Sequence, residues 1–440
     1  MSQLIVQKYG GTSVGSLARI QNIANHIYHT LEKDQVQILV VVSAMGAHTD
    51  ELYEMAHTLH PHPPKRELDM LVTSGERISA ALLSIALARL GLASISLTGS
   101  QSGILTDDTH GNARISKILG QRIREGLQAN KVVIVAGFQG MNLETKDVTT
   151  LGRGGSDLTA VALASHFKAA LCQIYTDVLG VMTADPRTVP SAQLLTHISW
   201  ESMSCLAWAG AGILHHRAAF VASKDQVPLE IRSSLQFDHR GTLIHGPLRE
   251  SVTPSPSTSL RTGSVEGSQV KPQQISIKGN QDMESPIVYA LAHKTKQIFI
   301  RIHFEMVHPR QEFSVAQVLR WLWKNEESPP LFRQFKSLQA KNELICELVC
   351  SERVLSLLSA ELPSLGAETF SIEILGRDLA LLSLVGAGFR QSPEIIEKIL
   401  GLLPEISVLD LDDNTICIAV PMSRMEADIQ TLHQNMISNP

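Results

Sequence analysis

The residues with the clearest potential for chemistry form the stretch 149–160, which reads TTLGRGGSDLTA. Its three glycines permit backbone conformations and close approaches that a Cβ would prevent, and Ser156 or Asp157 can cap the apolar run that follows. A turn that leads into a helix N-terminus presents N–H groups and a partial positive charge to a phosphate or carboxylate. Arg153 adds a bidentate fork, and Asp157 could hold a phosphate-bound Mg²⁺ or orient a cation. The alternative is an ordinary glycine-rich connection between a strand and a helix.

A second candidate loop follows the apolar run at residues 4–7. Lys8 is followed by two glycines and two hydroxyls in the sequence KYGGTSV, so one ammonium and several backbone donors could grip phosphate oxygens. The stretch lacks the Walker spacing, and no GxGxxG dinucleotide fingerprint follows an expected strand. A lysine that reaches solvent from a strand end is the alternative, but a second glycine-rich loop in the same sheet favours the phosphate site.

Both loops need a scaffold that brings them together, and the first 245 residues carry its pattern. Short apolar runs alternate with helical patterns, as in parallel strands crossed by helices. The expected strands are residues 4–7, 36–42, 93–97, 132–136, 170–175 and 228–232, with helices near 17–31, 51–55 and 67–90. We therefore predict an α/β fold with a mainly parallel sheet sandwiched by helices. Ligands gather at the carboxyl ends of such strands, where both loops fall.

Composition narrows the class of protein. With 440 residues, of which 44% are hydrophobic, the chain can form several domains with sizeable cores. The net charge of −5 offers no basic surface, so no nucleic-acid partner is expected. No apolar run approaches the roughly 20 residues that span a membrane, and the N-terminus lacks a signal pattern. The five cysteines show no metal-ligand spacing. These features predict a soluble cytoplasmic protein with no membrane partner.

Six segments of the chain resemble the aspartate kinases of the amino-acid-kinase family and occur in that family's order. The segments are residues 8–14 (KYGGTSV), 41–50 (VVSAMGAHTD), 74–79 (SGERIS), 137–140 (GFQG), 149–160 and 174–187 (IYTDVLGVMTADPR). The resemblance implies ATP-dependent phosphorylation of the β-carboxylate of L-aspartate to 4-phospho-L-aspartate. It further implies that ATP and Mg²⁺ are the cofactors and that the reaction is the first step toward lysine, threonine and methionine.

The resemblance also implies roles for individual residues. Lys8 would stabilise charge on the transferring phosphoryl group, with Asp157 as a second catalytic residue. Substrate aspartate would be bound by Thr49, Glu76, Arg153 and Ser156. The expected ATP-binding residues, besides Lys8, are Gly10, Gly11 and Ser13, with Thr176, Asp177, Asp185 and Arg187. Because a carboxylate is already deprotonated at neutral pH, no general base is needed, and catalysis depends on alignment and charge neutralisation.

Some of these residues have plainer interpretations. Glu76 could be an exposed helical acid beside Arg77, and Thr49 could be a helix cap. Asp185 precedes a proline, and this pair commonly forms turns.

One position departs from the family pattern. Gly212 stands where the family has a lysine near the ATP phosphates, so Arg217, His215 or Arg187 would have to supply the missing charge. The departure keeps open a catalytically weak regulatory paralogue as an alternative function. A kinase for another amino acid, such as glutamate, is the second alternative.

Beyond residue 245 the sequence predicts a Ser- and Pro-rich linker at 246–272 and two rounds of strands and helices at 273–375 and 376–440. Both rounds resemble α+β, ferredoxin-like ACT domains, which bind small regulatory molecules and imply a homodimer or higher oligomer. The first round lacks the family's effector-site sequence and has MVHPR at 306–310 and PLFR at 330–333 instead. We therefore expect weak or no feedback inhibition by lysine or threonine.

Overall fold

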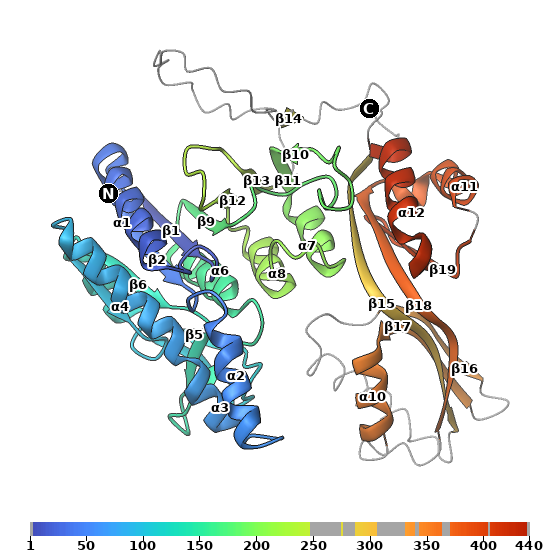
Figure 1. The fold of residues 1–440 in the computed structure, drawn as a ribbon, viewed down its shortest axis with the longest axis horizontal. Coiled ribbons are helices and arrows are strands. Elements are labelled where there is room, and N and C mark those ends of the chain that lie inside the picture. The colour runs from blue at the N-terminus through green and yellow to red at the C-terminus, as the bar shows by residue number, and fades with distance from the viewer. Residues whose placement is uncertain are drawn as a thin grey trace.

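The structure, a computed structural model, describes residues 3–246, 274–275, 287–305, 331–338, 343–362, 370–403 and 405–437. The described residues form an α/β part up to residue 246 and an antiparallel sheet with helices from residue 287 onward, and the two parts lie side by side (Figure 1). The sequence also predicts a helix at 314–323. This stretch and the MVHPR segment lie outside the described residues, as does the predicted linker beyond residue 246.

An eight-stranded sheet forms the centre of the α/β part, in the order β11-β13-β12-β9-β1-β2-β6-β3. Neighbouring strands run parallel, apart from the antiparallel pair β12 and β13. The strands are β1 (Leu4–Tyr9), β2 (Gln37–Val42), β3 (Ser94–Leu97), β6 (Val132–Ala136), β9 (Leu171–Thr176), β11 (His197–Ser199), β12 (Leu229–Ser233) and β13 (Thr242–His245). All six strands expected from the sequence are present.

Helices cover both faces of this sheet because successive strand residues point to opposite sides. Val6 packs with the helices of one face, whereas Tyr9 packs with those of the other. The first face carries α5 (Gln121–Gln128), α6 (Gly155–Phe167), α7 (Trp200–Trp208) and α8 (His216–Asp225). The second carries α1 (Leu17–Asp34) and α4 (Ser74–Arg89). The hydroxyl of Ser16 accepts from the Arg19 amide and begins α1, which then buries one apolar stripe.

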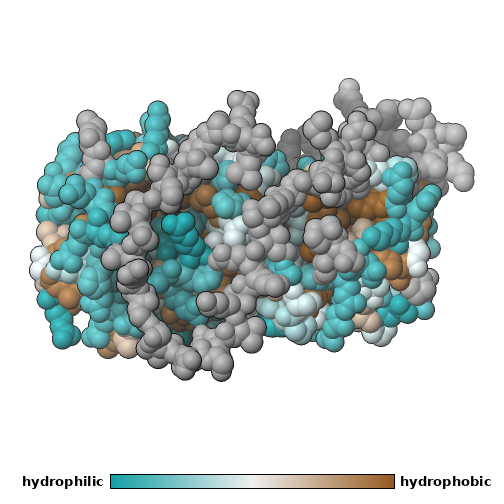
Figure 2. All heavy atoms as spheres, turned by 90° about the horizontal axis from the view of Figure 1, so that it is seen from above, coloured by the Kyte–Doolittle hydropathy of each residue, from teal (hydrophilic) through white to brown (hydrophobic). Residues whose placement is uncertain are grey.

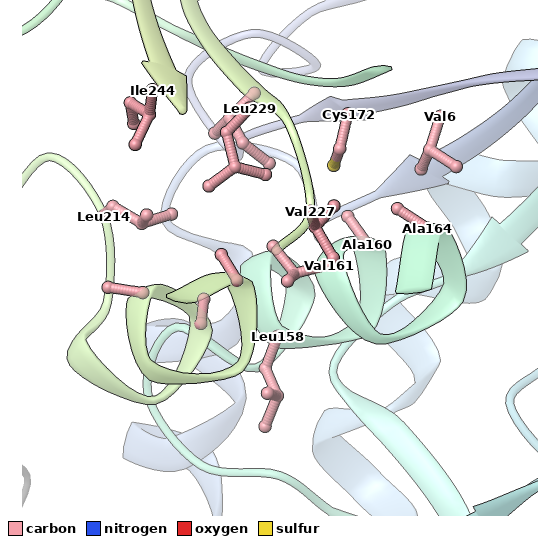
Figure 3. Packing of buried hydrophobic residues seen from close by; sticks show 14 of the residues in the cluster. Val6, Leu158, Ala160, Val161, Ala164, Cys172, Leu214, Val227, Leu229 and Ile244 are labelled. Atoms are coloured by element: carbon pink, nitrogen blue, oxygen red, sulfur yellow. The ribbon is translucent and has the colours of Figure 1, made fainter. Parts of the chain in front are cut away.

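Helix α6 is the most deeply placed of these helices and carries the glycine-rich stretch at its N-terminus. Figure 3 shows Ala160, Val161 and Ala164 of α6 facing the strands that hold Val6 and Cys172. Small side chains let the helix approach the sheet closely, and α8 covers its outer side. This packing fixes the start of α6 against the carboxyl end of β1.

A smaller sheet of short strands lies beside the carboxyl ends of the main sheet, in the order β5-β4-β7-β8, and was not predicted from the sequence. Helix α3 packs against β8, and α2 packs against α3. The elements are β4 (Ile104–Thr106), β5 (Ile115–Ile118), β7 (Gln139–Asn142), β8 (Val148–Thr150), α2 (His48–Leu59) and α3 (Lys65–Val72).

One helical stretch among the described residues, Lys65–Arg89, is long and apolar enough to cross a membrane by length and composition. It combines α3 with α4, and 44% of its apolar window is buried inside the protein. Leu83 and Leu87 pack against the main sheet, and Asp69 and Glu76 are buried polar residues on the same stretch. These contacts are those of a core helix.

A six-stranded antiparallel sheet forms the C-terminal part, in the order β16-β17-β15-β18-β20-β19. Its strands are β15 (Ile287–Glu305), β16 (Leu331–Leu338), β17 (Glu343–Ser351), β18 (Phe370–Ala387), β19 (Val408–Leu411) and β20 (Thr415–Pro421). Helix α10 (Glu352–Glu361) covers one end, and α11 (Pro393–Leu402) with α12 (Met425–Leu432) covers the other. The sequence predicts two separate strands, at 287–292 and 298–304, where the single 19-residue β15 is found.

The two ACT-like units are joined by the long strands β15 and β18. Strand β18 runs across the expected boundary between residues 375 and 376, so the same two strands serve α10 at one end and α11 and α12 at the other. The division into units at 273–375 and 376–440 therefore remains a proposal from the sequence, and the described strands of both units form one continuous sheet.

Residues 183–189 of the α/β part pack directly against the C-terminal part. The Leu291 amide donates to the Thr183 carbonyl at 2.8 Å, and the Thr183 hydroxyl lies 2.9 Å from Nε2 of His433. Ala184 and Val189 belong to the same buried cluster as Leu291. Hydrophilic side chains occupy much of the face visible in Figure 2, with separate hydrophobic patches between them.

Candidate active site

A cavity of about 2080 Å³ opens at the carboxyl ends of the main sheet, between the two glycine-rich loops and the small sheet. Seven of the residues singled out from the sequence line it: Lys8, Gly11, Thr49, Glu76, Arg153, Ser156 and Asp157. They come from segments up to 149 positions apart, and the parallel sheet brings them together as predicted.

Lys8 and Asp157 form an ion pair in the floor of the cavity. Nζ of Lys8 lies 2.6 Å from Oδ1 of Asp157, and both side chains are largely buried. Lys8 is at the end of β1, and Asp157 is in the first turn of α6, where a carboxylate is favoured by the helix dipole. The carboxylate holds the ammonium at the N-terminus of α6, the position where an anionic ligand would meet both.

Glu76 is a buried carboxylate whose hydrogen bonding is incomplete within the described residues. Only 3% of the residue is exposed, and Oε1 accepts from the Ala44 amide at 3.1 Å. Oε2 is buried and has no hydrogen-bond partner among the described residues. Burial raises the pKa of Glu76 to about 7, and the amide and Arg77 oppose the rise. The interpretation as an exposed helical acid is therefore wrong, and the second carboxylate oxygen is available to a donor from a ligand.

The turn that carries Arg153 depends on two glycines in left-handed backbone conformation. Gly152 has φ +78° and Gly154 has φ +67°. A Cβ at Gly154 would lie 2.2 Å from Cβ of His215, so this position has no room for a side chain. Arg153 between them is exposed at the wall of the cavity.

Thr49 and Ser156 complete the set of hydroxyls at the cavity. Ser156 is buried in the first turn of α6, and Thr49 is half-buried near the start of α2. Ala47 occupies the N-cap position of α2 and makes no side-chain cap bond, so the interpretation of Thr49 as a helix cap is wrong. Thr49 instead lines the cavity.

The loop after β1 is held by backbone bonds that change one expectation. The Gly10 amide donates to the Tyr175 carbonyl at 3.2 Å, so it does not offer the phosphate donor that was predicted. The Ser13 hydroxyl donates to Ser234 at 2.8 Å. Gly11 is closely packed, since an added Cβ would lie 3.1 Å from the Ala44 carbonyl oxygen. The loop therefore presents Lys8 and Gly11 to the cavity, while Gly10 and Ser13 fix its shape.

Two charged residues that support the cavity wall, one buried and one half-buried, were missed or assigned differently from the sequence. Asp69 of α3 is 1% exposed and bonds to His110, Gly111 and Thr150. Arg217 of α8 donates to Asn112 Oδ1 and to the carbonyls of Ala113 and Leu151. No sequence motif marked Asp69, because an acid in an amphipathic helix normally faces solvent.

Comparison with known proteins decides the family. Residues 3–233 match the amino acid kinase family. Over 435 residues, 98% of this chain, the sequence is 36% identical to an aspartokinase of Geobacillus stearothermophilus and covers 96% of it. The chain belongs to the aspartokinase family. Over 247 residues, 56% of this chain and 58% of the relative, an aspartokinase of Corynebacterium glutamicum is 54% identical.

The fold class predicted for this aspartokinase-family chain is confirmed by a solved structure. E. coli aspartokinase III, in complex with aspartate and ADP, superposes with a TM-score of 0.73 at 21% identity. The match covers 99% of this chain and 100% of that one, so it includes both the kinase part and the ACT-like part.

The segment expected to bind the nucleotide in this aspartokinase-family chain lies apart from the cavity. Asp185 and Arg187 pair with each other at 2.7 Å in an exposed turn, where Asp185 also accepts from the Arg187 amide. Thr176 donates to Asp177 at 3.1 Å. None of these four residues is among the described residues that line the cavity, and the turn interpretation describes the local geometry of Asp185.

Gly212 adopts φ +68° on the exposed loop before α8, and a Cβ there would meet open space. The Arg217 guanidinium bonds to the loop carbonyls named above, and the residue also lines the cavity. His215 caps α8 by accepting from the Arg217 amide and packs on Gly154, while Arg187 is paired in its turn. His215 and Arg217 both line the cavity, so the expectation that one of these residues faces the phosphates stays a prediction.

The residues of the cavity can be compared with what a magnesium ion requires. No group of three or more His, Cys, Asp or Glu side chains suited to a metal occurs in the described ranges. Mg²⁺ in kinases needs only one or two carboxylates beside the substrate phosphates and waters. Asp157 is a carboxylate at the phosphoryl end of the cavity and fits this requirement.

Proposed function

We propose that this chain is an ATP-dependent aspartate kinase that converts L-aspartate to 4-phospho-L-aspartate, the entry step toward lysine, threonine and methionine. The observation that carries the proposal is one cavity lined by the Lys8–Asp157 pair, by Arg153 and by Glu76 with its unpartnered carboxylate oxygen. The similarity to full-length aspartokinases supports the substrate.

The amino-acid end of the substrate would occupy the region of Glu76 and Arg153. An α-ammonium group would satisfy Oε2 of Glu76, which is buried without a donor among the described residues. The Arg153 guanidinium would fork onto the α-carboxylate, and the hydroxyls of Thr49 and Ser156 would complete the contacts. A substrate that satisfies a buried charged group is selected over analogues that leave it unsatisfied.

The phosphoryl end would lie over Lys8 and the N-terminus of α6. The β-carboxylate attacks the γ-phosphorus, the bond to the ADP oxygen breaks, and the charge that develops is stabilised by the Lys8 ammonium and the helix N-terminus. Asp157 keeps the ammonium in place. Mg²⁺ bound to ATP neutralises phosphate charge, and Asp157 is the residue we propose to hold it. Gly11 offers close backbone approach, with Gly10 and Ser13 shaping the loop.

The nucleotide would extend from Lys8 toward the end of β9. Thr176 is linked to the phosphate loop because its carbonyl accepts from Ser234, which in turn accepts from Ser13. We propose Thr176 and Asp177 for the base and ribose, and Asp185 with Arg187 for the phosphates after a rearrangement of their exposed turn. The remaining proposals are a cytoplasmic location and a homodimer or higher oligomer formed through the ACT-like units.

A hydroxamate assay tests the function directly. Purified protein with Mg-ATP should form aspartyl hydroxamate from L-aspartate and at most a trace from L-glutamate, whereas Lys8→Ala should form neither. Preference for glutamate would overturn the substrate, and the absence of any product with correctly folded protein would support the regulatory paralogue instead.

A further inference from the structure

The Asp69 carboxylate is a hub that joins three segments of the cavity wall. Its Oδ2 lies 2.7 Å from Nδ1 of His110, and the Gly111 amide donates to Oδ1 at 3.1 Å. The Thr150 hydroxyl donates to Oδ1 at 2.6 Å. With 1% of the residue exposed, water does not compete for these bonds. All three of these groups bond to one carboxylate, so Asp69 fixes the positions of His110, Gly111 and Thr150 relative to one another.

The bonded segments lead to Arg153 by two short routes. Thr150 ends β8 and is three residues before Arg153. The loop of His110 and Gly111 also presses on the turn, since a Cβ at Gly152 would lie 3.1 Å from the Gly111 carbonyl oxygen. The Ala113 amide donates to the Thr150 carbonyl at 2.8 Å and locks the two routes together.

Arg217 holds the same structure from the opposite side. Its guanidinium reaches Asn112 Oδ1 at 2.9 Å, the Ala113 carbonyl at 2.8 Å and the Leu151 carbonyl. Burial lowers the pKa of Arg217. A buried anion on α3 and a half-buried cation on α8 therefore hold residues 110–113 and 150–151 between them.

We propose that Asp69, acting through Thr150 and His110, is a positioning residue for Arg153 and so for recognition of the substrate carboxylate. The proposal rests on the function proposed above. His110 itself lines the cavity, with 20% of its side chain exposed, so the same unit also forms part of the surface that the amino acid meets. Releasing the unit should loosen the Arg153 turn while leaving Lys8 and the nucleotide region in place.

The test removes single bonds and measures each substrate separately. Thr150→Val keeps the shape of the side chain and removes its hydroxyl, and we expect the aspartate KM to rise about tenfold because one bond to a buried charge is lost. The ATP KM should stay unchanged within error, and Thr150→Ser, which restores the hydroxyl, should restore the aspartate KM. His110→Ala should act in the same direction as Thr150→Val, and His110→Asn, whose amide can still reach Asp69, should act less.

Thr242→Val is the matched control. Thr242 is equally buried, and its hydroxyl donates to the Leu195 carbonyl at 2.6 Å, far from the cavity lining. This variant should lower Tm and leave both KM values unchanged. If Thr150→Val and His110→Ala both have the same KM values for aspartate and ATP as the wild type, the positioning role is overturned.

Aspartate binding by calorimetry, measured without turnover, separates the two proposals. If the wild type binds and phosphorylates aspartate, and Thr150→Val and His110→Ala bind aspartate equally well, only the positioning role of Asp69 is overturned. If the wild type does not bind aspartate, both the proposed function and the positioning role are overturned. If Thr150→Val does not fold, the His110 pair of variants still decides the result.

Discussion

Among single residues, Glu76 shows most directly how the site trades stability for recognition. Burial raises its pKa from 4.5 to about 7, so the folded protein binds a proton between these values that the unfolded chain has released. Stability contributed by the neutral form is present at low pH and is lost as the pH rises through about 7. The ionised form, which an α-ammonium group needs, is therefore the less stable one until substrate arrives.

This sign gives a pH-dependent prediction. The aspartate KM should rise as the pH falls below about 7, because protonated Glu76 loses the negative charge that attracts an ammonium group. Glu76→Gln should have a higher KM that no longer varies with pH in this range. Its Tm should exceed that of the wild type by a margin that grows from about pH 5 to about pH 8. A margin that shrinks with rising pH would contradict the burial argument.

Lys8→Ala should lower kcat by at least about 100-fold, because water cannot replace a fixed ammonium at the transition state. The sequence alone predicts little change in Tm for this variant. The 2.6 Å pair with Asp157 changes that expectation, because removing Lys8 leaves a largely buried carboxylate uncompensated and Tm should fall. The double change Lys8→Met with Asp157→Asn should recover Tm without recovering kcat. Wild-type kcat in Lys8→Ala would remove Lys8 from the mechanism.

Arg153→Lys should raise the aspartate KM on the order of tenfold and leave the ATP KM nearly unchanged, since lysine keeps the charge but loses the two-pronged geometry. Steady-state kinetics with each substrate varied in turn would measure this. An effect on ATP alone would move Arg153 out of the aspartate subsite.

The turn between β8 and α6 is the element on which these residues depend, and a pair of glycines tests it. Gly154 and Gly212 have nearly equal φ values of +67° and +68°, but only Gly154 is packed against another side chain. Gly212→Ala should lower stability by about 1 kcal/mol from backbone strain. Gly154→Ala adds the clash with His215, so it should lower Tm further and raise the aspartate KM. Equal effects on Tm would mean that His215 moves aside freely.

The elements that follow simple periodicity were predictable, and those that depend on distant partners were not. Buried strands such as β6 are predicted by their runs of apolar residues. The sequence predicts two strands, at 287–292 and 298–304, yet the chain of β15 continues between them through a bulge with Lys296 at φ +55°. Asp69 was not predicted as a buried residue because its burial depends on a loop that is 41 residues away in the sequence.

The two halves of the molecule meet at the segment we assign to the nucleotide. Thr183 bonds to Leu291 and His433, and the exposed pair Asp185 and Arg187 follows immediately. A change in the ACT-like part would thus reach this turn through direct contacts. Such coupling needs an effector that prefers one state over the other.

We predict that lysine and threonine, alone or together, inhibit this protein weakly or not at all. The basis is the sequence at 306–310, MVHPR, which lacks the family's effector-site pattern and lies outside the described residues. Kinase activity titrated with each amino acid and with both, alongside calorimetry, would measure the effect. Half-maximal inhibition at millimolar or lower concentration would show that an effector pocket survives under a different sequence.

The continuous strands β15 and β18 have a practical consequence for anyone who dissects this chain. A fragment cut at residue 375 would divide β18 and expose unpaired backbone edges on β15 and β20, which pair with it on either side. In hydrogen-exchange measurements, the slowly exchanging amides of the C-terminal part should therefore lose protection in one cooperative event. Fragments that contain only one of its ACT-like units should aggregate.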